Sequence, residues 1–290
     1  MSGPLIGIDW GTTNCRTFLI ENGVVLRRAQ DTRGAISLTT GDYPRILATL
    51  RAQFGDLPVM ITGMAGSRIG WREVPYVETP AGLDAIARGV THIDSRTLIV
   101  PGVADLRQDR VDVMRGEETL ILGGLASGAL AQDALVCQPG THCKWADVSD
   151  GRITRFITSM TGELFALLRG HGLLANQLAA AVEVGTAYCE GVAEGARRDL
   201  GASLFGIRSN GLLGRRDDAE AASFASGLLI GADVAARLAD HPGVPVALIA
   251  NQSLGELYQV AIELLGGSAS QIEVDHVFVA GITALRNMIR

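Results

Sequence analysis

Charged side chains are scarce in this sequence of 290 residues, making up 19% of it with a net charge of −6. There is no basic run and no aromatic-basic platform, so nucleic acid is not expected as a partner. Lysine is almost missing, because all of the 25 basic residues except Lys144 are arginine. No Lys or Arg precedes Arg16, and Asp9 interrupts the first apolar run, which fits neither a signal peptide nor a membrane span. We therefore expect a cytoplasmic protein without a membrane partner.

Cysteine is also rare, and the usual nucleotide-loop patterns are missing. The four cysteines have no metal-ligand spacing, so we expect buried thiols in a reducing compartment. The chain contains neither a Gly-Lys-Ser/Thr phosphate loop nor the glycine spacing of a dinucleotide fold. An apolar content of 47% predicts a globular chain of about two domains. A stretch rich in Ala, Gly and Ser at residues 124–133 places the boundary between residues 1–130 and 131–290.

The stretch from Leu5 to Ile20 predicts a hairpin that binds phosphate. Two apolar runs, Leu5–Ile8 and Thr17–Ile20, have strand length, so the polar residues between them fall at the turn. Gly11 allows backbone N–H groups to close on an anion, and Thr12 and Thr13 add hydroxyl donors. Asp9 at the mouth of such a turn is suited to holding Mg²⁺, usually through water. The alternative is an ordinary β-turn that contains an acid.

A second copy of this pattern lies at Leu135–Trp145. It again joins an apolar run to a Gly-Thr turn, Gly140-Thr141, and to a basic residue, Lys144. Asn22-Gly23 follows the first copy and Asp150-Gly151 the second, and both dipeptides favour two-residue hairpins. The two hairpin glycines are 128 residues apart and the two turn glycines 129. The sequence therefore predicts two homologous lobes, each with one phosphate loop.

Periodicity and turn residues predict the remaining elements. We expect strands at residues 58–62, 97–100, 245–250 and 276–280. We expect helices at residues 42–54, 83–90, 116–124, 159–168, 173–200 (as one or two), 217–240, 253–265 and 284–290. Gly123-Gly124 and Gly201 are expected to end helices, residues 208–211 to form a turn, and Ser253 to begin a helix in a capping box with Glu256.

Asp9-Trp-Gly-Thr-Thr13 with Arg16 resembles the first phosphate motif of the actin, sugar kinase and heat-shock ATPase superfamily. Four further blocks together resemble the 2-dehydro-3-deoxygalactonokinase family over nearly the whole chain. They are Gly63–Trp71 with Pro75, Val100–Val103, Asp112–Glu118 and Pro139–Lys144. The resemblance implies an α/β fold of two ribonuclease H-like lobes with ATP in the cleft between them. It also implies phosphorylation of the 6-hydroxyl of 2-dehydro-3-deoxygalactonate, in galactonate catabolism, with ATP and Mg²⁺ as cofactors.

The resemblance also assigns roles to individual residues. Glu117, which follows a glycine at the expected start of a helix, is the candidate base, and Asp9 the catalytic and metal-binding acid. The candidate phosphate ligands are Gly11, Thr12, Thr13, Gly140, Thr141 and Lys144, and Gly281 is the candidate adenosine contact. The candidate sugar-acid ligands are Arg16, Ser67, Arg68, Arg115 and His142.

Several alternatives stay open at this point. Related sugar kinases mostly carry Asp where this chain has Glu117, so Asp112 and Glu118 compete for the role of base. Acids in the first turn of a helix also have a structural explanation in the helix dipole. The fold also serves kinases of other sugars and non-catalytic actin-like switches. The sequence leaves a homo-oligomer open.

Overall fold

The computed structural model describes residues 3–197 and 199–289, and the chain folds into two compact units. The first unit comprises the chain up to Asp133, residues 146–156 and the C-terminal segment from Val274; the second comprises residues 134–145 and 157–273. We expected the C-terminal segment in the second lobe, whereas it packs in the first unit. The N-terminal part of the first unit ends three residues beyond the expected boundary.

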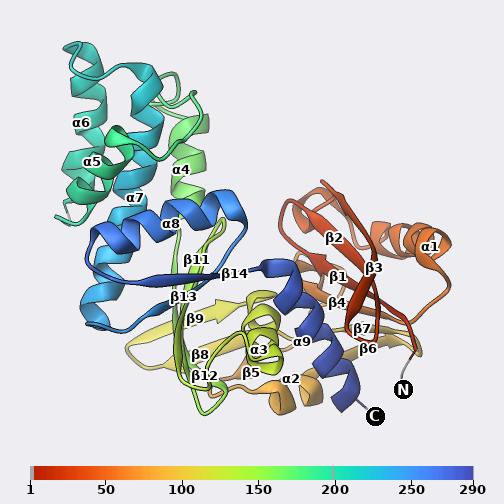
Figure 1. The fold of residues 1–290 in the computed structure, drawn as a ribbon. Coiled ribbons are helices and arrows are strands. Elements are labelled where there is room, and N and C mark those ends of the chain that lie inside the picture. The colour runs from red at the N-terminus through yellow and green to blue at the C-terminus, as the bar shows by residue number, and fades with distance from the viewer. Residues whose placement is uncertain (1–2, 198, 290) are drawn as a thin grey trace. The chain divides into compact units, whose positions relative to one another are not determined.

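The first unit is built on a six-stranded sheet in the order β3-β2-β1-β4-β7-β6 (Figure 1). Its strands are β1 (Leu5–Trp10), β2 (Cys15–Glu21), β3 (Val24–Asp31), β4 (Val59–Gly63), β6 (Thr91–Asp94) and β7 (Thr97–Ile99). A three-stranded sheet is formed by β5 (Val77–Glu78), β8 (Val103–Arg107) and β9 (Arg110–Met114). The helical segments are η1 (Ala35–Ser37), α1 (Asp42–Phe54), η2 (Met64–Gly66), α2 (Leu83–Gly89), α3 (Glu117–Ser127) and α9 (Val274–Met288).

The second unit contains the strands β10 (Ala134–Gln138), β13 (Val246–Ile249) and β14 (Ala269–Ile272). Its helices are α4 (Thr161–Gly170), α5 (Thr186–Gly195), α6 (Leu200–Leu212), α7 (Asp218–Asp240) and α8 (Gln252–Leu264). The hairpin β11 (Cys143–Ser149) and β12 (Arg152–Ser159) completes a five-stranded sheet in the order β12-β11-β10-β13-β14. The tip of this hairpin, residues 146–156, groups with the first unit.

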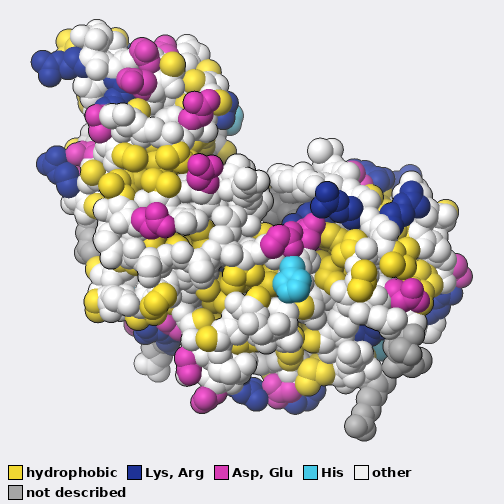
Figure 2. All heavy atoms as spheres, viewed as in Figure 1, with side chains coloured by type: hydrophobic (Ala, Val, Ile, Leu, Met, Phe, Trp, Pro, Cys, Tyr) yellow, Lys and Arg dark blue, Asp and Glu magenta, His cyan; other side chains and the backbone are white. Residues whose placement is uncertain are grey.

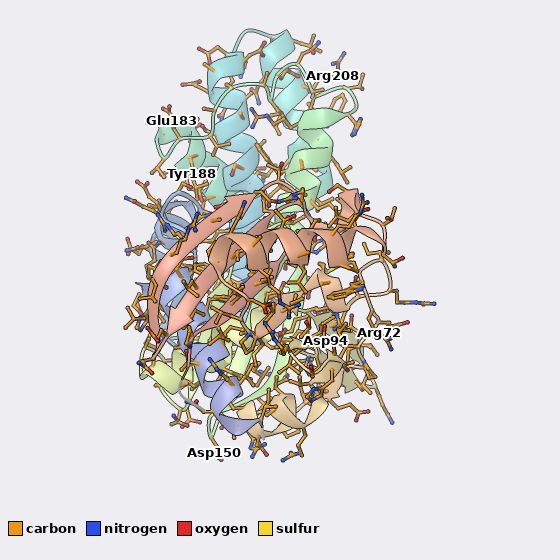
Figure 3. The ribbon with its side chains drawn as sticks, turned by 90° about the vertical axis from the view of Figure 1, so that its right-hand side faces the viewer. Arg72, Asp94, Asp150, Glu183, Tyr188 and Arg208 are labelled. Atoms are coloured by element: carbon orange, nitrogen blue, oxygen red, sulfur yellow. The ribbon has the colours of Figure 1, made fainter. Side chains whose placement is uncertain are left out.

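The two large sheets repeat one topology, which confirms the predicted internal duplication. In each sheet three consecutive strands lie in reverse order, and two later strands follow in parallel. Both hairpin turns have positive φ at their two central residues: 52° and 77° at Asn22-Gly23, and 49° and 67° at Asp150-Gly151. Positive φ at both positions matches the right-handed twist of the flanking strands, and Figure 3 shows Asp150 at the tip of the second hairpin.

The first unit buries an aromatic cluster against its sheet. Trp10, at the end of β1, lies 4.6 Å from Tyr43 of α1, and Tyr43 stacks on Trp71 at 5.9 Å, measured between ring centroids. On α9, Phe278 lies 5.0 Å from Phe18 of β2, also between ring centroids. These contacts hold α1 against β1, the strand that carries Asp9, and α9 against the neighbouring strand β2.

Two pairs of helices pack so closely that their backbones are in contact, and glycines lie at these contacts. A Cβ at Gly123 of α3 would lie 1.9 Å from the Val277 carbonyl oxygen, and a Cβ at Gly281 of α9 would lie 2.3 Å from the Thr119 carbonyl oxygen. The same close approach joins α5 to α7 in the second unit, through Gly191, Gly195, Gly227 and Gly231. These glycines are therefore required by packing rather than by a turn.

The observed helix bounds correct several of the expectations. Gly123 and Gly124 lie inside α3, which continues to Ser127 and ends at the left-handed Gly128. Gly201 lies inside α6, as does the expected turn at residues 208–211. The long helix expected at residues 173–200 is wrong, because α5 starts only at Thr186 and turns precede it. The cap of α8 is Asn251 instead of Ser253.

The helix α7 is, within the described residues, the one that is long and apolar enough to cross a membrane. About three quarters of its apolar window, 72%, is buried inside the chain, as in the core helix of a globular domain. Figure 2 shows acidic and basic side chains interspersed on the face it draws.

Candidate active site

The first phosphate turn, Gly11–Asn14, joins β1 to β2 and is braced from one side. The N–H groups of Ala35 and Ile36 donate to the carbonyl oxygens of Gly11 and Thr12, at 3.0 and 3.2 Å. Across a trans peptide the N–H points away from the carbonyl. The N–H groups of Thr12 and Thr13 therefore point away from the brace, as an anion site requires.

Gly34 is the residue of this brace that the sequence did not single out. A Cβ at Gly34 would lie 2.2 Å from the Thr12 carbonyl oxygen and 2.3 Å from the Cα of Thr13. Only glycine allows the segment to lie directly against the turn. Its φ of −73° is ordinary, so nothing in the local pattern marks it.

Asp9 lies at the end of β1, paired across the hairpin with Arg16 of β2. Arg16 donates to Oδ2 of Asp9 from Nη2 at 2.5 Å and from Nε at 3.0 Å. Its Nη1 also lies 3.3 Å from a carboxylate oxygen of Asp275 in α9. Arg16 is therefore engaged by two acids, and the structure supports it as a partner of Asp9 more than as a sugar-acid ligand.

Two glycines bring the start of α3 to the other oxygen of Asp9. Gly63 and Gly116 have φ values of 83° and 109°, which non-glycine residues rarely adopt. A Cβ at Gly63 would lie 3.4 Å from Oδ1 of Asp9, and a Cβ at Gly116 would lie 3.8 Å from it and 3.2 Å from the Cα of Gly63. The space beside Oδ1 is therefore kept free of side chains. Glu117 follows Gly116 directly.

The three candidate bases have different surroundings. Glu117, the first residue of α3, is partly exposed and accepts a hydrogen bond from the N–H of Arg115 at 2.9 Å. Glu118 is fully buried and accepts from the N–H of Gly116 at 2.6 Å and from the Thr119 hydroxyl at 3.0 Å. Burial, and secondly the charge of Glu117, raise the pKa of Glu118 to about 8.

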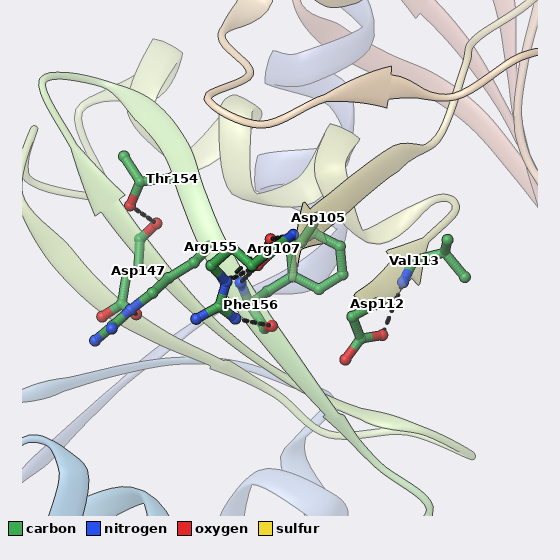
Figure 4. A network of polar contacts seen from close by, with 8 residues as sticks. All are labelled: Asp105, Arg107, Asp112, Val113, Asp147, Thr154, Arg155 and Phe156. Atoms are coloured by element: carbon green, nitrogen blue, oxygen red, sulfur yellow. Dashed lines mark hydrogen bonds and ion pairs between the residues drawn. The ribbon is translucent and has the colours of Figure 1, made fainter. Parts of the chain in front are cut away.

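Asp112 lies within β9, opposite Asp105 of β8, and accepts a hydrogen bond from the N–H of Val113 at 2.8 Å. Figure 4 shows it beside a polar network in which the buried Asp105 accepts from Arg107 at 2.8 Å and from the N–H of Phe156 at 3.3 Å. This network joins β8 to the tip of the β11–β12 hairpin. The buried charge of Asp105 is therefore balanced by Arg107, away from the start of α3.

The segment after β4 holds the next two candidates. Ser67 donates its hydroxyl to the carbonyl oxygen of Met64 at 2.7 Å, within the turn η2. Arg68 is a surface side chain, 87% exposed, with Glu73 at 3.7 Å. Arg115 lies buried against the same segment.

The second phosphate turn, Gly140–His142, is braced by α4 as the first is by η1. The N–H of Glu163 donates to the carbonyl oxygen of Thr141 at 2.8 Å, so the N–H of His142 points away from α4. A Cβ at Gly162 would lie 2.3 Å from the Gly140 carbonyl oxygen. The Glu163 carboxylate also accepts a hydrogen bond from Nε2 of His142 at 2.6 Å. Gly162 and Glu163 were missed, although a glycine in the first turn of a helix is a usable signal.

Lys144 and the nearby cysteines line the hairpin behind this turn. Lys144 is a buried residue, 5% exposed, and its ammonium donates to the Thr158 hydroxyl at 2.7 Å. Sγ of Cys137 lies 3.7 Å from Sγ of Cys143, both fully buried, and burial raises the pKa of both thiols. A nucleophilic role for Cys143 has no support, since a thiolate is disfavoured there.

Gly281 differs from its expected setting. The expected strand at residues 276–280 is wrong, since these residues lie in α9, and Gly281 is buried against Thr119 and Gly123 of α3. Its missing side chain is explained by this packing. The run His276–Ala280 is largely apolar because Val277, Phe278 and Val279 are buried in succession within α9.

Two sheets that share a five-strand order, each led by a hairpin with a Gly-Thr turn, form the fold of the actin-like ATPases and sugar kinases, which confirms the expected fold class. The model of the 2-keto-3-deoxy-galactonokinase family matches residues 9–285. The chain belongs to this family. This confirms the resemblance to a sugar-acid kinase that uses ATP.

Individual relatives agree with this assignment. A 2-dehydro-3-deoxygalactonokinase of Escherichia coli (strain K12) is 33% identical over 294 residues, covering 100% of this chain and 99% of the relative. A probable 2-dehydro-3-deoxygalactonokinase of Rhizobium meliloti (strain 1021) is 36% identical, covering 99% and 98%. A crystal structure from Sinorhizobium meliloti, provisionally described as a 2-dehydro-3-deoxygalactonokinase, is 35% identical with a TM-score of 0.91, covering 98% of this chain and 99% of its own.

Proposed function

We propose that this chain transfers the terminal phosphoryl group of ATP to the 6-hydroxyl of 2-dehydro-3-deoxy-D-galactonate, in the cytoplasm. Membership of the family supports the reaction class and the sugar acid. The observation that supports the catalytic assignment is the close approach of Gly63 and Gly116 near Oδ1 of Asp9, because Glu117 follows Gly116 at the start of α3.

Glu117 acts as the general base. It is the partly exposed acid of the pair that opens α3, whereas Glu118 is enclosed and holds the N–H of Gly116. As the O–P bond to the 6-hydroxyl forms and the bond to ADP breaks, the hydroxyl proton passes to the Glu117 carboxylate. The hydrogen bond from the N–H of Arg115 fixes that carboxylate on one side.

The two braced turns bind phosphate oxygens. In each turn a brace occupies carbonyl oxygens, so that N–H groups face the opposite way, those of Thr12 and Thr13 in the first and of His142 in the second. Phosphoryl transfer depends mainly on such positioning and on electrostatic stabilisation, because the protein forms no covalent bond to the phosphoryl group.

Asp9 is the residue that would hold Mg²⁺. The described residues contain no group of three or more His, Cys, Asp or Glu side chains that could enclose a metal. Mg²⁺ beside a nucleotide needs only one or two carboxylates, with water and phosphate oxygens as the other ligands. Arg16 donates to Oδ2 of Asp9, and Gly63 and Gly116 extend no side chain toward Oδ1, so Oδ1 fits this role. The ion would neutralise phosphate charge there.

The test is ADP release, followed through a coupled assay with ATP and Mg²⁺ on 2-dehydro-3-deoxygalactonate, 2-dehydro-3-deoxygluconate and neutral hexoses. We expect turnover on the galactonate and a loss of kcat in Glu117→Gln of roughly 100-fold or more, the usual size of a general-base effect. Nuclear magnetic resonance of the product identifies the phosphorylated oxygen. Glu78→Gln is the matched control, because Glu78 is an exposed acid on β5.

Each other outcome has a definite meaning. Full turnover in Glu117→Gln would contradict the assignment of the base. Turnover only on another sugar or sugar acid would contradict the proposed substrate, and ATP binding without any turnover would favour a nucleotide switch.

A further inference from the structure

Arg115 carries a buried guanidinium with unused donors. The side chain is 8% exposed and lies between the end of β9 and the start of α3. Nη2 donates to the carbonyl oxygen of Val74 at 2.8 Å, and the guanidinium carbon lies 4.2 Å from the ring centroid of Tyr76. Nε and Nη1 are shielded from solvent and have no hydrogen-bond partner.

This arrangement is costly unless an anion completes it. Within residues 3–197 and 199–289, no carboxylate forms an ion pair with Arg115. A buried charge without a hydrogen-bonded counter-charge is strongly disfavoured, and a single neutral acceptor with an aromatic face compensates only part of that cost. A bound carboxylate would supply both the missing charge and acceptors for the unused N–H groups.

The other two arginine candidates lack this property. Arg16 already has Asp9 and Asp275 as partners, and Arg68 extends from the surface of its turn. Arg115 is also linked to the candidate base, because its backbone N–H donates to Glu117. A six-carbon sugar acid has its carboxylate and its 6-hydroxyl at opposite ends, so one residue must recognise each end.

We propose that the Arg115 guanidinium binds the carboxylate of the sugar acid and thereby sets the preference for acids over neutral sugars. The inference rests on the proposed function. Gly66, Val74 and Tyr76 cover the guanidinium in this structure, so the carboxylate enters when the segment 66–76 moves aside. No water has to be removed from Nε or Nη1, since neither atom is exposed.

Two substrates separate recognition from a structural role. One is 2-dehydro-3-deoxygalactonate, and the other is its neutral analogue with a hydroxymethyl group in place of the carboxylate. The proteins compared are wild type, Arg115→Met and the control Arg72→Met. Arg72 lies in the same segment and is exposed, at the outer edge of the first unit in Figure 3.

We expect Arg115→Met to lower kcat/KM for the acid by roughly 10- to 150-fold, the value of a hydrogen bond to a charged group. The neutral analogue, a weak substrate of the wild type, should be used equally well by both proteins, and Arg72→Met should resemble wild type on both. Equal losses on the acid and the analogue would overturn the inference while leaving the proposed function intact. A wild type that prefers the neutral analogue would overturn both.

A second variant covers the case in which Arg115→Met does not fold. A Cβ at Gly66 would lie 2.9 Å from Nη1 of Arg115 and 3.0 Å from a methyl of Ile99, and Gly66 has no positive φ. Gly66→Ala should therefore displace the guanidinium without straining the backbone. We expect it to raise KM for the acid and not for the analogue; an equal change on both would overturn the inference.

Discussion

Glu118 offers a direct test of the electrostatics at the start of α3. It is fully buried, its oxygens accept from the Gly116 N–H and the Thr119 hydroxyl, and its pKa is raised to about 8 from an ordinary value of 4.5. At pH 7 it is therefore mostly protonated and neutral. The substitution Glu118→Gln keeps the size and an acceptor oxygen while removing the titration.

The sign of the effect follows from proton binding. Below pH 4.5 the carboxyl is protonated in both the folded and the unfolded state. As the pH rises from 4.5 to 8, the unfolded chain releases this proton while the folded chain keeps it, so wild type loses stability over that window. The shift corresponds to at most about 5 kcal/mol in the free energy of unfolding, complete above pH 8.

The measurement is urea unfolding of wild type and Glu118→Gln at several pH values from 5 to 8.5, followed by fluorescence. We expect the stability of the variant relative to wild type to increase steadily across this window. Glu78→Gln, an exposed acid changed in the same way, should show no such trend. A difference that is constant with pH would refute the reasoning, because it would mean that Glu118 titrates alike in both states.

Two further predictions concern packing. Gly281→Ala places a methyl 2.3 Å from the Thr119 carbonyl oxygen, so we expect the free energy of unfolding to fall by about 1–3 kcal/mol, and an unchanged melting temperature would contradict the α3–α9 contact. Asp233→Asn in α7 should cost about 1–3 kcal/mol in denaturant unfolding, whereas Asp240→Asn at the exposed end of the helix should cost little. The buried Asp233 accepts hydrogen bonds from Trp145, Ser159, Thr161 and Tyr258.

Elements with strong local signals were predicted well. The helix at residues 42–54 has the predicted ends, and both hairpin turns have the φ values that Asn-Gly and Asp-Gly favour. These features depend on neighbours in sequence, so the sequence contains the necessary information. Because the same hairpin pattern occurs twice in the sequence, the repetition also predicted that the second lobe has the topology of the first.

Two of the errors have a tertiary cause. Gly123 and Gly124 were assigned to a helix end because glycine is a poor helix former, whereas Gly123 faces a second helix and Gly124 the side chain of Leu130. Gly201 has no such neighbour, since nothing lies within 4 Å of a Cβ built there. The candidate site shows the same limit of sequence reasoning. The sequence named Asp9 and Glu117 as candidates, but only the parallel pairing of β1 with β4 shows that Gly63 and Gly116 lie near Oδ1 of Asp9.

The duplicated hairpins differ in the side chains that flank their turns. At the 129-residue spacing of the turn glycines Asp9 corresponds to Gln138, and at the 128-residue spacing of the hairpin glycines Arg16 corresponds to Lys144. The first copy keeps a carboxylate paired with a guanidinium, whereas the second has a buried neutral amide and an ammonium that donates to Thr158. A neutral amide beside the second turn adds no negative charge where phosphate would bind. The two turns have thus kept their braced backbone while only the first retains a side chain suited to a metal ion.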